Sequence, residues 1–361
     1  MTPTLGVITP GLRTTVQDLG RVGYQSFGIG LSGALDPVSL RAANALVGNP
    51  PGAGALEATY MGPSLVVEAE EARLAFVGAQ ASIEVLPDAT AVNGRRIATS
   101  RSVRLRCGEV ARVGSLSGGP VLYIAVEGGF DIAPVLGSLS TDTRGRIGGL
   151  QGRALLANDQ LPLRQMRPSG RDDLQLDDFD LTLPPRFRVI LGPQHNYFPD
   201  SAIATFFGSE YTVSAHSDRI GMRLDGPPIN QDNDLGFTSG GTAPGSIQVT
   251  GSGQPIVLMP DRQTTGGYPK IATVISADLP ALGRLPIGAK IAFEPVTVAA
   301  AQVLRRELLA AIDAIGDKLL PLGQIEADVS PMLLGCNLIS GVVDGRGSLT
   351  TTASEHIHRS K

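Results

Sequence analysis

The sequence predicts a mainly β chain with few short helices, and three observations indicate this class. First, 45 glycines and 26 prolines punctuate short apolar runs instead of pooling into low-complexity tracts. Second, many of these runs alternate apolar and polar residues with the period of two that is typical of strands. Third, turn dipeptides such as Asn93-Gly94 separate the runs. A length of 361 residues suggests two domains of about 150 residues each.

The N-terminal part contains one short helix with clear signals. Residues 11–33 are rich in glycine and are predicted to form loop with short strands. Asp36 is a favoured N-cap residue, and Pro37 suits the first helical position, where no N–H is needed. Gly48 can end the helix. We therefore predict a helix that begins at Pro37 and ends just before Gly48.

Short strands dominate the rest of the first block. After Gly62-Pro63 the apolar residues recur at period two or in short runs, and turn signals at Asn93-Gly94 and at 117–119 separate them. Spacing of this kind suits a barrel or a sandwich. The predicted strands are 65–68, 74–77, 82–86, 102–113 and 121–126.

A second strand-rich block follows a polar segment. Residues 167–185 hold five aspartates and few large apolar residues, so they are predicted to be an acidic linker. Strands 247–249 and 256–258 flank Gly251-Ser252-Gly253 and are predicted to form a hairpin. The other predicted strands of this block are 187–191, 211–215, 222–224 and 290–293.

The chain closes with a predicted amphipathic helix over 297–315, which Gly316 ends, and a polar tail. The predicted organisation therefore has four parts. They are an N-terminal β-barrel-like subdomain over 1–166, the acidic linker over 167–185, a C-terminal β-barrel-like subdomain over 186–296, and a helix and tail over 297–361.

Composition excludes several classes of function. A net charge of -4 provides no basic surface for nucleic acid or an acidic membrane. No stretch approaches the roughly 18 apolar residues of a membrane span, and no secretory signal is recognisable at the N-terminus. The two cysteines, Cys107 and Cys336, are far apart, and the four histidines are scattered. We expect a cytoplasmic protein with no disulfide framework, no metal site and neither nucleic acid nor membrane as a partner.

The segment Gly28-Ile29-Gly30-Leu31-Ser32-Gly33 matches G-x-G-x-x-G. A dinucleotide site also needs alternating strands and helices around such a motif, and this chain lacks them. Two interpretations stay open. The glycine-rich backbone beside a helix N-terminus can hold a carboxylate or phosphate, or it can be a tight turn that only needs glycine. The chain has no Walker loop, so any ATP is not held in that way.

The segment Asp261 to Lys270 has the densest polar chemistry. Seven of its ten residues carry polar side chains, and it follows an apolar, strand-like run. Gly266 and Gly267 permit close backbone approach, and Pro269 stiffens the exit. Such a loop can present donors to a small polar ligand, or it can be a long polar hairpin loop.

From about residue 5 to residue 296 the chain carries a long, ordered series of motifs. They include GLRTTVQDLGR at 11–21, SGALDP at 32–37, RAANALVGN at 41–49, RIG at 219–221, PGSIQV at 244–249 and the loop 261–270. This series resembles the second-subdomain family of urea carboxylase carboxyltransferases. The family is also called biotin-dependent carboxyltransferase, allophanate hydrolase subunit 2 or KipA-like, and it includes bacterial 5-oxoprolinase C subunits, the members nearest in size.

The resemblance implies two cyclophilin-like β-barrel domains and a site built from named residues. Asp261 is the expected catalytic acid, base or orienting group, and Lys270 the second catalytic residue. Substrate-binding roles are expected for Gln17, Asp18, Ser32, Arg219, Gln248, Gln263, Thr264, Gly266, Gly267 and Tyr268. Three positions depart from the pattern expected of the family: Asp218 stands for Asn, Met222 for Tyr, and Gly240 for Glu.

The resemblance also implies partners and leaves three functions open. The first is a subunit of an ATP-dependent 5-oxoprolinase, which hydrolyses a lactam and acts with a KipI-like first-subdomain subunit and a third oxoprolinase subunit. ATP would then be used at the level of the complex. The second is a biotin-dependent carboxyltransferase subunit acting on urea or a related amide, with biotin supplied by a partner because no Met-Lys-Met motif is present. The third is a non-catalytic regulator of a KipI-like partner.

Overall fold

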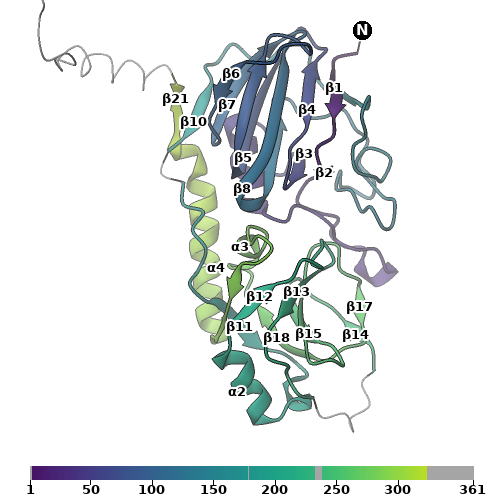
Figure 1. Cartoon of the computed structure of the whole chain (residues 1–361), viewed down its shortest axis with the longest axis vertical. Helices are drawn as coiled ribbons and strands as arrows, with labels where there is room; N and C mark the ends of the chain where they lie inside the picture. The colour runs from purple at the N-terminus through teal and green to yellow at the C-terminus, as the bar shows by residue number, and fades with distance from the viewer. Residues whose placement is uncertain (1, 178, 232–237, 323–361) are drawn as a thin grey trace, which may run out of the picture.

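The structure is a computed structural model that describes residues 2–177, 179–231 and 238–322. In this part of the chain the strands form an eleven-stranded sheet, an eight-stranded sheet and a two-stranded ribbon. The eleven-stranded sheet forms the upper half of Figure 1 and the eight-stranded sheet the lower half. The prediction of a mainly β chain with few short helices and a C-terminal helix is confirmed.

The larger sheet collects strands from both ends of the described chain. Its strands are β1 (Thr4–Thr9), β2 (Arg13–Gln17), β3 (Ala55–Thr59), β4 (Ser64–Val67), β5 (Glu71–Leu86), β6 (Arg95–Ile97), β7 (Arg101–Arg106), β8 (Val110–Val126), β9 (Gln160–Pro162), β10 (Leu174–Leu176) and β21 (Leu319–Pro321). The main path runs β21-β10-β7-β5-β8-β4-β1-β9, while β6 pairs with β5 and β2 joins through β3 to β8.

The smaller sheet runs in the order β19-β12-β13-β16-β15-β18-β11-β20. Its strands are β11 (Phe187–Leu191), β12 (Tyr211–Val213), β13 (Gly221–Asp225), β15 (Ser246–Val249), β16 (Pro255–Leu258), β18 (Lys270–Val274), β19 (Lys290–Ile291) and β20 (Phe293–Pro295). The ribbon pairs β14 (Gly240–Gly241) with β17 (Thr265–Gly266). The predicted hairpin is confirmed, because β15 and β16 pair antiparallel.

The helices are few and mostly short. They are η1 (Gln25–Phe27), α1 (Pro37–Leu46), η2 (His195–Tyr197), α2 (Asp200–Gly208), α3 (Leu279–Leu282), α4 (Val298–Asp313) and η3 (Ala314–Lys318). The α1 prediction is confirmed: the Asp36 side chain accepts hydrogen bonds from the backbone N–H groups of Val38 and Ser39. The predicted helix over 297–315 is α4, which Thr297 caps and which continues as η3. Helices α2 and α3 were not predicted.

One long hairpin, β5 with β8, replaces several predicted strands. The predicted strands 74–77 and 82–86 are one strand, and the predicted strand 102–113 is broken at Cys107-Gly108. The predicted turn at 117–119 is wrong, because Ser117 pairs with Gln80 inside the hairpin. The register shifts beside Gly78, whose φ of 130° suits only glycine. Gly78 and the glycines of segment 117–119 therefore mark an irregular stretch inside the β5–β8 pair and not the end of a strand.

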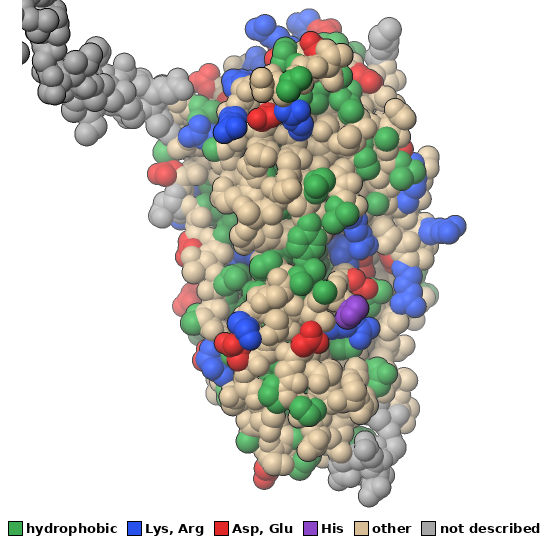
Figure 2. All heavy atoms as spheres, in the orientation of Figure 1, with side chains coloured by type: hydrophobic (Ala, Val, Ile, Leu, Met, Phe, Trp, Pro, Cys, Tyr) green, Lys and Arg blue, Asp and Glu red, His purple; other side chains and the backbone are tan. Residues whose placement is uncertain are grey.

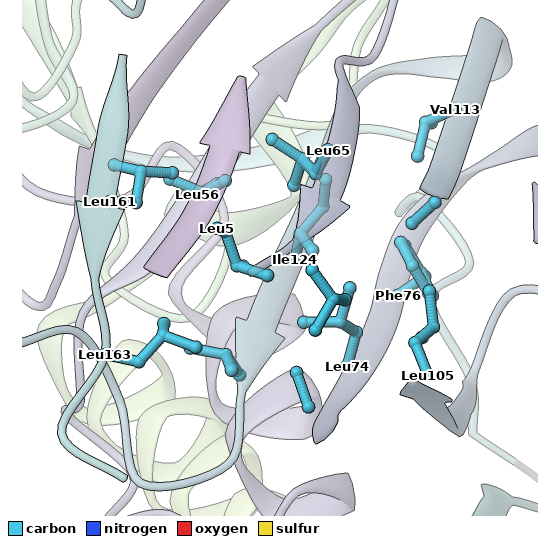
Figure 3. Close-up of a cluster of buried hydrophobic side chains, with 14 of the residues drawn as sticks. Leu5, Leu56, Leu65, Leu74, Phe76, Leu105, Val113, Ile124, Leu161 and Leu163 are labelled. Atoms are coloured by element: carbon cyan, nitrogen blue, oxygen red, sulfur yellow. The ribbon is translucent and has the colours of Figure 1, made fainter. Parts of the chain in front are cut away.

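The hairpin is buried on both faces, which explains its long apolar runs. Leu74 and Phe76 belong to the core cluster drawn in Figure 3, together with Ile124 and side chains of β1 and β4. The alternate residues, such as Ala75 and Val77, pack with α1 on the opposite face. A strand that has a core on each side carries apolar residues at consecutive positions.

The segment predicted as an acidic linker is partly built into the larger sheet. Strand β10 pairs with β7 and with β21, the strand that follows α4 and η3 (Figure 1). The Arg73 side chain, 1% exposed, forms ion pairs with Glu127 and with Asp173 of this segment. Asp173 therefore neutralises a buried cation, although in the sequence it is one of several polar residues. The division of the chain into subdomains that end at residues 166 and 296 stays a prediction.

The tail from residue 323 onward, with Cys336, His356 and His358, lies outside the described residues. Across the described ranges, no helix combines the length and the apolar character needed to cross a membrane.

We predict that Arg73→Ala lowers the free energy of unfolding by about 3–5 kcal/mol, because it leaves two carboxylates with no buried cation between them. Hydrogen exchange of residues 174–176 should also become faster. Chemical denaturation and exchange mass spectrometry measure both effects. Arg96→Ala is the matched control: Arg96 is 87% exposed and lies 3.7 Å from Glu84, so its loss should cost less than about 1 kcal/mol. Equal losses in the two variants would contradict the anchoring role of Arg73.

Candidate functional site between the two halves

A cleft of about 340 Å³ lies where the two halves meet. The upper half contributes Leu12, Arg13 and Tyr60, and the lower half contributes a larger set that includes Arg219 and Met259. In Figure 2 hydrophobic side chains gather at the middle of the molecule, where the two halves meet. The lining is therefore mostly apolar, and its charged members are Arg13, Asp218 and Arg219.

Arg219 is the central charged group of the cleft. It follows β12 in a turn that the Asp218 carboxylate holds by accepting from the N–H groups of Ile220 and Gly221. Its guanidinium donates to Glu57 of β3 and to both carboxylate oxygens of Asp261, at 2.8 and 3.0 Å. It also donates to the carbonyl oxygen of Gly33, at 2.6 Å. One cation of the lower half is thus shared with two groups of the upper half.

The network continues through the upper half and returns to the lower one. Glu57 accepts from the Tyr123 hydroxyl at 2.6 Å, and that hydroxyl accepts from the N–H of Asp36 at 2.8 Å. The Asp36 carboxylate caps α1 and also pairs with Arg284 at 3.0 Å. Two ion pairs, Arg219 with Glu57 and Arg284 with Asp36, therefore cross between the halves.

Burial shapes the charge states in this network. Burial and then the charges of Glu57 and Asp36 raise the pKa of the Tyr123 phenol well above its usual value, so the hydroxyl keeps its proton. Burial by itself lowers the pKa of Arg219, but the charges of Glu57 and Asp261 outweigh it and the pKa is raised. The cluster therefore holds a permanent cation between two carboxylates.

Asp261, the predicted catalytic acid or base, is fully engaged by this cation. Both of its oxygens accept from Arg219, and its side chain is 6% exposed. Such a carboxylate is suited to holding Arg219 and the start of the polar loop in place. Its backbone N–H adds a third link by donating to the Arg219 carbonyl at 2.8 Å.

The polar loop 261–270 is folded back by the β14–β17 ribbon, in which Gly240 pairs with Gly266. The Thr242 hydroxyl donates to the Gln263 carbonyl at 2.5 Å, and the Thr242 N–H donates to the Thr264 carbonyl. A Cβ at Gly266 would lie 2.4 Å from Nε2 of Gln248, so a larger residue there would displace the Gln248 side chain. The backbone of Gln263 and Thr264 is thus used to shape the loop.

Lys270 and its neighbours form the second group of predicted residues that the structure brings together. Lys270 is 4% exposed, and its backbone pairs in register with that of Gln248. Burial lowers the pKa of the Lys270 ammonium group. Gln248 donates to the Tyr268 carbonyl at 3.3 Å. A Cβ at Gly240 would lie 3.9 Å from Nζ of Lys270, so the position that departs from the expected family pattern borders the predicted catalytic lysine. Gly267 lies in the same loop, next to the half-exposed Tyr268.

Gln17 and Asp18 form hydrogen bonds within the upper half. Gln17 donates to Thr15 and to the Thr141 carbonyl. Asp18 accepts from Ser138, Ser140, the N–H of Leu139 and the N–H of Gly20, so it holds two loops together. The neighbouring Arg21 donates to the carbonyls of Val135 and Ser140.

Ser32 lies at the contact between the halves, where its N–H donates to the carbonyl of Pro260 at 3.2 Å. The sequence prediction missed three partners that organise the site: Glu57, Tyr123 and Arg284. It also gave no role to Arg262 of the predicted loop. The signal for Arg262 was a cation four residues after the end of an apolar strand, because arginine is rarely fully buried.

With this geometry established, comparison with known proteins identifies the family. The family model described as "Carboxyltransferase domain, subdomain A and B" matches residues 27–295, three quarters of the chain. The chain belongs to this carboxyltransferase family. The resemblance expected from the motifs is therefore confirmed, and Arg219, Asp261 and Lys270 of the candidate site all lie within the matched residues.

Members of the carboxyltransferase family with named functions resemble the chain over most of its length. It is 40% identical over 291 residues to the 5-oxoprolinase C subunit of Escherichia coli, covering 80% of this chain and 90% of that protein. It is 36% identical over 298 residues to the corresponding 5-oxoprolinase C subunit of Haemophilus influenzae, covering 82% of this chain and 92% of that protein.

A solved carboxyltransferase-family structure is also similar. The K. lactis urea amidolyase has a TM-score of 0.77 and 30% identity, and the match covers 89% of this chain. The chain spans only 21% of that larger protein. These relatives are enzymes or enzyme subunits, which agrees with the prediction of an enzyme subunit.

We predict that Arg219→Met lowers the free energy of unfolding by about 3–5 kcal/mol, because Glu57 and Asp261 are left buried without their shared cation. Denaturant unfolding of the full chain measures the loss. Arg223→Met is the matched control, since Arg223 has an exposed side chain four residues further along and should change stability by less than about 0.5 kcal/mol. A loss below about 1 kcal/mol in Arg219→Met would show that the cluster does not join the halves.

Proposed function

We propose that the chain is a subunit of an ATP-dependent 5-oxoprolinase that acts with a KipI-like partner and a third subunit. The observation that carries this proposal is its match to the C subunits of two 5-oxoprolinases over nine tenths of their length. The site geometry is compatible with it, because a buried lysine borders a glycine-rich loop with amide and hydroxyl donors.

The proposed reaction is hydrolysis of a lactam. Water adds to the ring carbonyl carbon, the C–N bond breaks, and the former ring nitrogen becomes the amino group of glutamate. Negative charge develops on the carbonyl oxygen as water adds, and donors placed at that oxygen lower the barrier. Lys270 is proposed to donate there, with the backbone of Gly266 and Gly267 and the side chains of Gln248, Gln263, Thr264 and Tyr268 lining the substrate.

Asp261 is proposed to act as a positioning residue. Its carboxylate holds Arg219, and Arg219 holds Glu57 of the opposite half. Through these contacts it fixes the start of the loop that ends at Lys270. ATP is proposed to be bound and hydrolysed at the level of the complex, where it supplies the driving force.

A second candidate function is carboxyl transfer to urea or a related amide, with carboxybiotin supplied by a partner. The observation that favours it is the TM-score of 0.77 to K. lactis urea amidolyase over most of this chain. The same lysine and loop would then hold the acceptor amide.

Assay of the assembled complex separates the two functions. We expect the chain, co-expressed and purified with its KipI-like and third subunits, to form glutamate from 5-oxoproline only with ATP, and avidin should have no effect. Glutamate is measured by an enzyme-coupled assay. Inhibition by avidin would favour carboxyl transfer, and an assembled complex that makes no glutamate would contradict the oxoprolinase proposal and favour a regulatory role.

Substitution of the lysine tests the site itself. We predict that Lys270→Met lowers kcat of the complex by about 10²–10³-fold, the usual cost of one donor to a developing oxyanion, with thermal unfolding of the chain retained. Lys290→Met is the matched control, because Lys290 is 63% exposed and pairs at the surface with Glu210. A kcat for Lys270→Met within twofold of the control would remove Lys270 from the mechanism.

A further inference from the structure

A second pocket of about 160 Å³ also lies between the halves. Leu35, Met259 and Leu282 line both this pocket and the larger cleft, so they form a shared wall. Most of the remaining lining is aliphatic, and the two polar side chains are Ser32 from the upper half and Arg262 from the lower half.

Arg262 is a buried cation without a counter-charge in the described part of the chain. Its side chain is 2% exposed, and neither Nε nor Nη1 has a hydrogen-bond partner there. Of the other deeply buried arginines, Arg73 and Arg219 each hold two carboxylates, and Arg21 donates to two backbone carbonyls. Burial of an unpaired guanidinium is costly, so its retention in a pocket calls for a ligand that compensates the charge.

Arg262 keeps its charge at neutral pH despite this environment. Burial lowers the pKa of its guanidinium to about 10, which is still well above the pH of the cell interior or of a neutral buffer. A fully charged guanidinium therefore lies beside the pocket, and its Nε and Nη1 have no hydrogen-bond partner among the described residues.

Ser32 is the second polar residue of the pocket lining and comes from the upper half. It is 2% exposed, and its Oγ has no hydrogen-bond partner in the described residues. Its backbone is left-handed, with φ of 52°, and its N–H is fixed by the Pro260 carbonyl at 3.2 Å. A serine held in a sparsely populated conformation against the loop of Arg262 is typical of a binding site.

We propose that this pocket binds a small monocarboxylate with a compact apolar body, whose carboxylate accepts hydrogen bonds from Arg262 and Ser32. A guanidinium matches a carboxylate with two parallel N–H···O bonds. The aliphatic walls favour an apolar body, and one cation with one hydroxyl suits a single negative charge better than the double charge of phosphate.

5-Oxoproline carries one carboxylate on a compact five-membered ring, although its lactam group is polar and the walls of the pocket are aliphatic. Its assignment as the natural occupant rests on the proposed function, whereas the carboxylate specificity of the pocket rests on Arg262 and Ser32 alone. In that assignment the pocket selects a carboxylate such as 5-oxoproline against neutral amides such as urea. None of residues 263–270 is among those that line it.

Calorimetric titration of the full chain tests the proposal with three probes. Cyclopentanecarboxylate has the ring and the carboxylate, 5-oxoproline has both and the lactam, and 2-pyrrolidinone lacks the carboxylate. We expect the two carboxylates to bind and 2-pyrrolidinone to bind at least tenfold more weakly, about 1.4 kcal/mol. Tighter binding of inorganic phosphate than of cyclopentanecarboxylate would overturn the carboxylate assignment.

Variants locate the binding. Arg262→Gln should weaken carboxylate binding at least tenfold and Ser32→Ala severalfold, while Arg223→Gln, at an exposed arginine, should leave it unchanged. Unchanged affinity in Arg262→Gln overturns the proposal.

Thermal unfolding checks that the variant folds, and we expect no loss of stability because an unpaired buried charge is removed. Should Arg262→Gln fail to fold, Arg262→Lys decides: it keeps the charge but loses the paired contact, and unchanged affinity would again overturn the proposal.

The same variant distinguishes this inference from the proposed function. Carboxylate binding that depends on Arg262, in a complex that forms no glutamate, supports the pocket and contradicts the oxoprolinase. Glutamate formation with an unchanged KM for 5-oxoproline in Arg262→Gln supports the oxoprolinase and overturns the pocket as its carboxylate site.

Discussion

Arg219 extends from the lower half into the upper one, where it donates to Glu57 and to the Gly33 carbonyl, while its remaining N–H groups bind Asp261. Because the cluster is buried, each carboxylate depends on the same cation for its stability. Glu57 in turn accepts from the N–H of Leu35, which lines both pockets. The loop, the cleft and the second pocket are therefore all linked to this one guanidinium.

The site consists of a charged cluster and a polar loop, and the two have different roles. The cluster of Arg219, Glu57 and Asp261 has its donors and acceptors satisfied within the chain, so it is rigid and suited to holding the halves in register. The loop before Lys270 is built from glycines and backbone hydrogen bonds, so it presents donors at close range. A predicted catalytic residue, Asp261, thus belongs to the first group by its contacts, and Lys270 to the second.

The sequence predicted best what is decided locally. The helix after Asp36 was predicted because its cap and first-turn proline lie within two residues of each other. The β5–β8 hairpin was predicted as fragments, because its glycine-bearing irregularity depends on the opposite strand. The site shows the same limit: Arg219 and Glu57 are 162 residues apart, and Asp18 meets Ser140 across 122 residues. Family motifs singled out Arg219 and Asp18, but only tertiary structure shows which group each one binds.

The wall formed by Leu35, Met259 and Leu282 has a thermodynamic consequence. Its residues come from both halves, and so do the linings on either side of it. A small molecule bound there contacts both halves at once, and its binding free energy is lost if they separate. By mass action such a ligand raises the free energy of parting the halves by RT ln(1 + [L]/Kd). The concentration of ligand therefore adds to the free energy that the ion pairs between the halves already contribute.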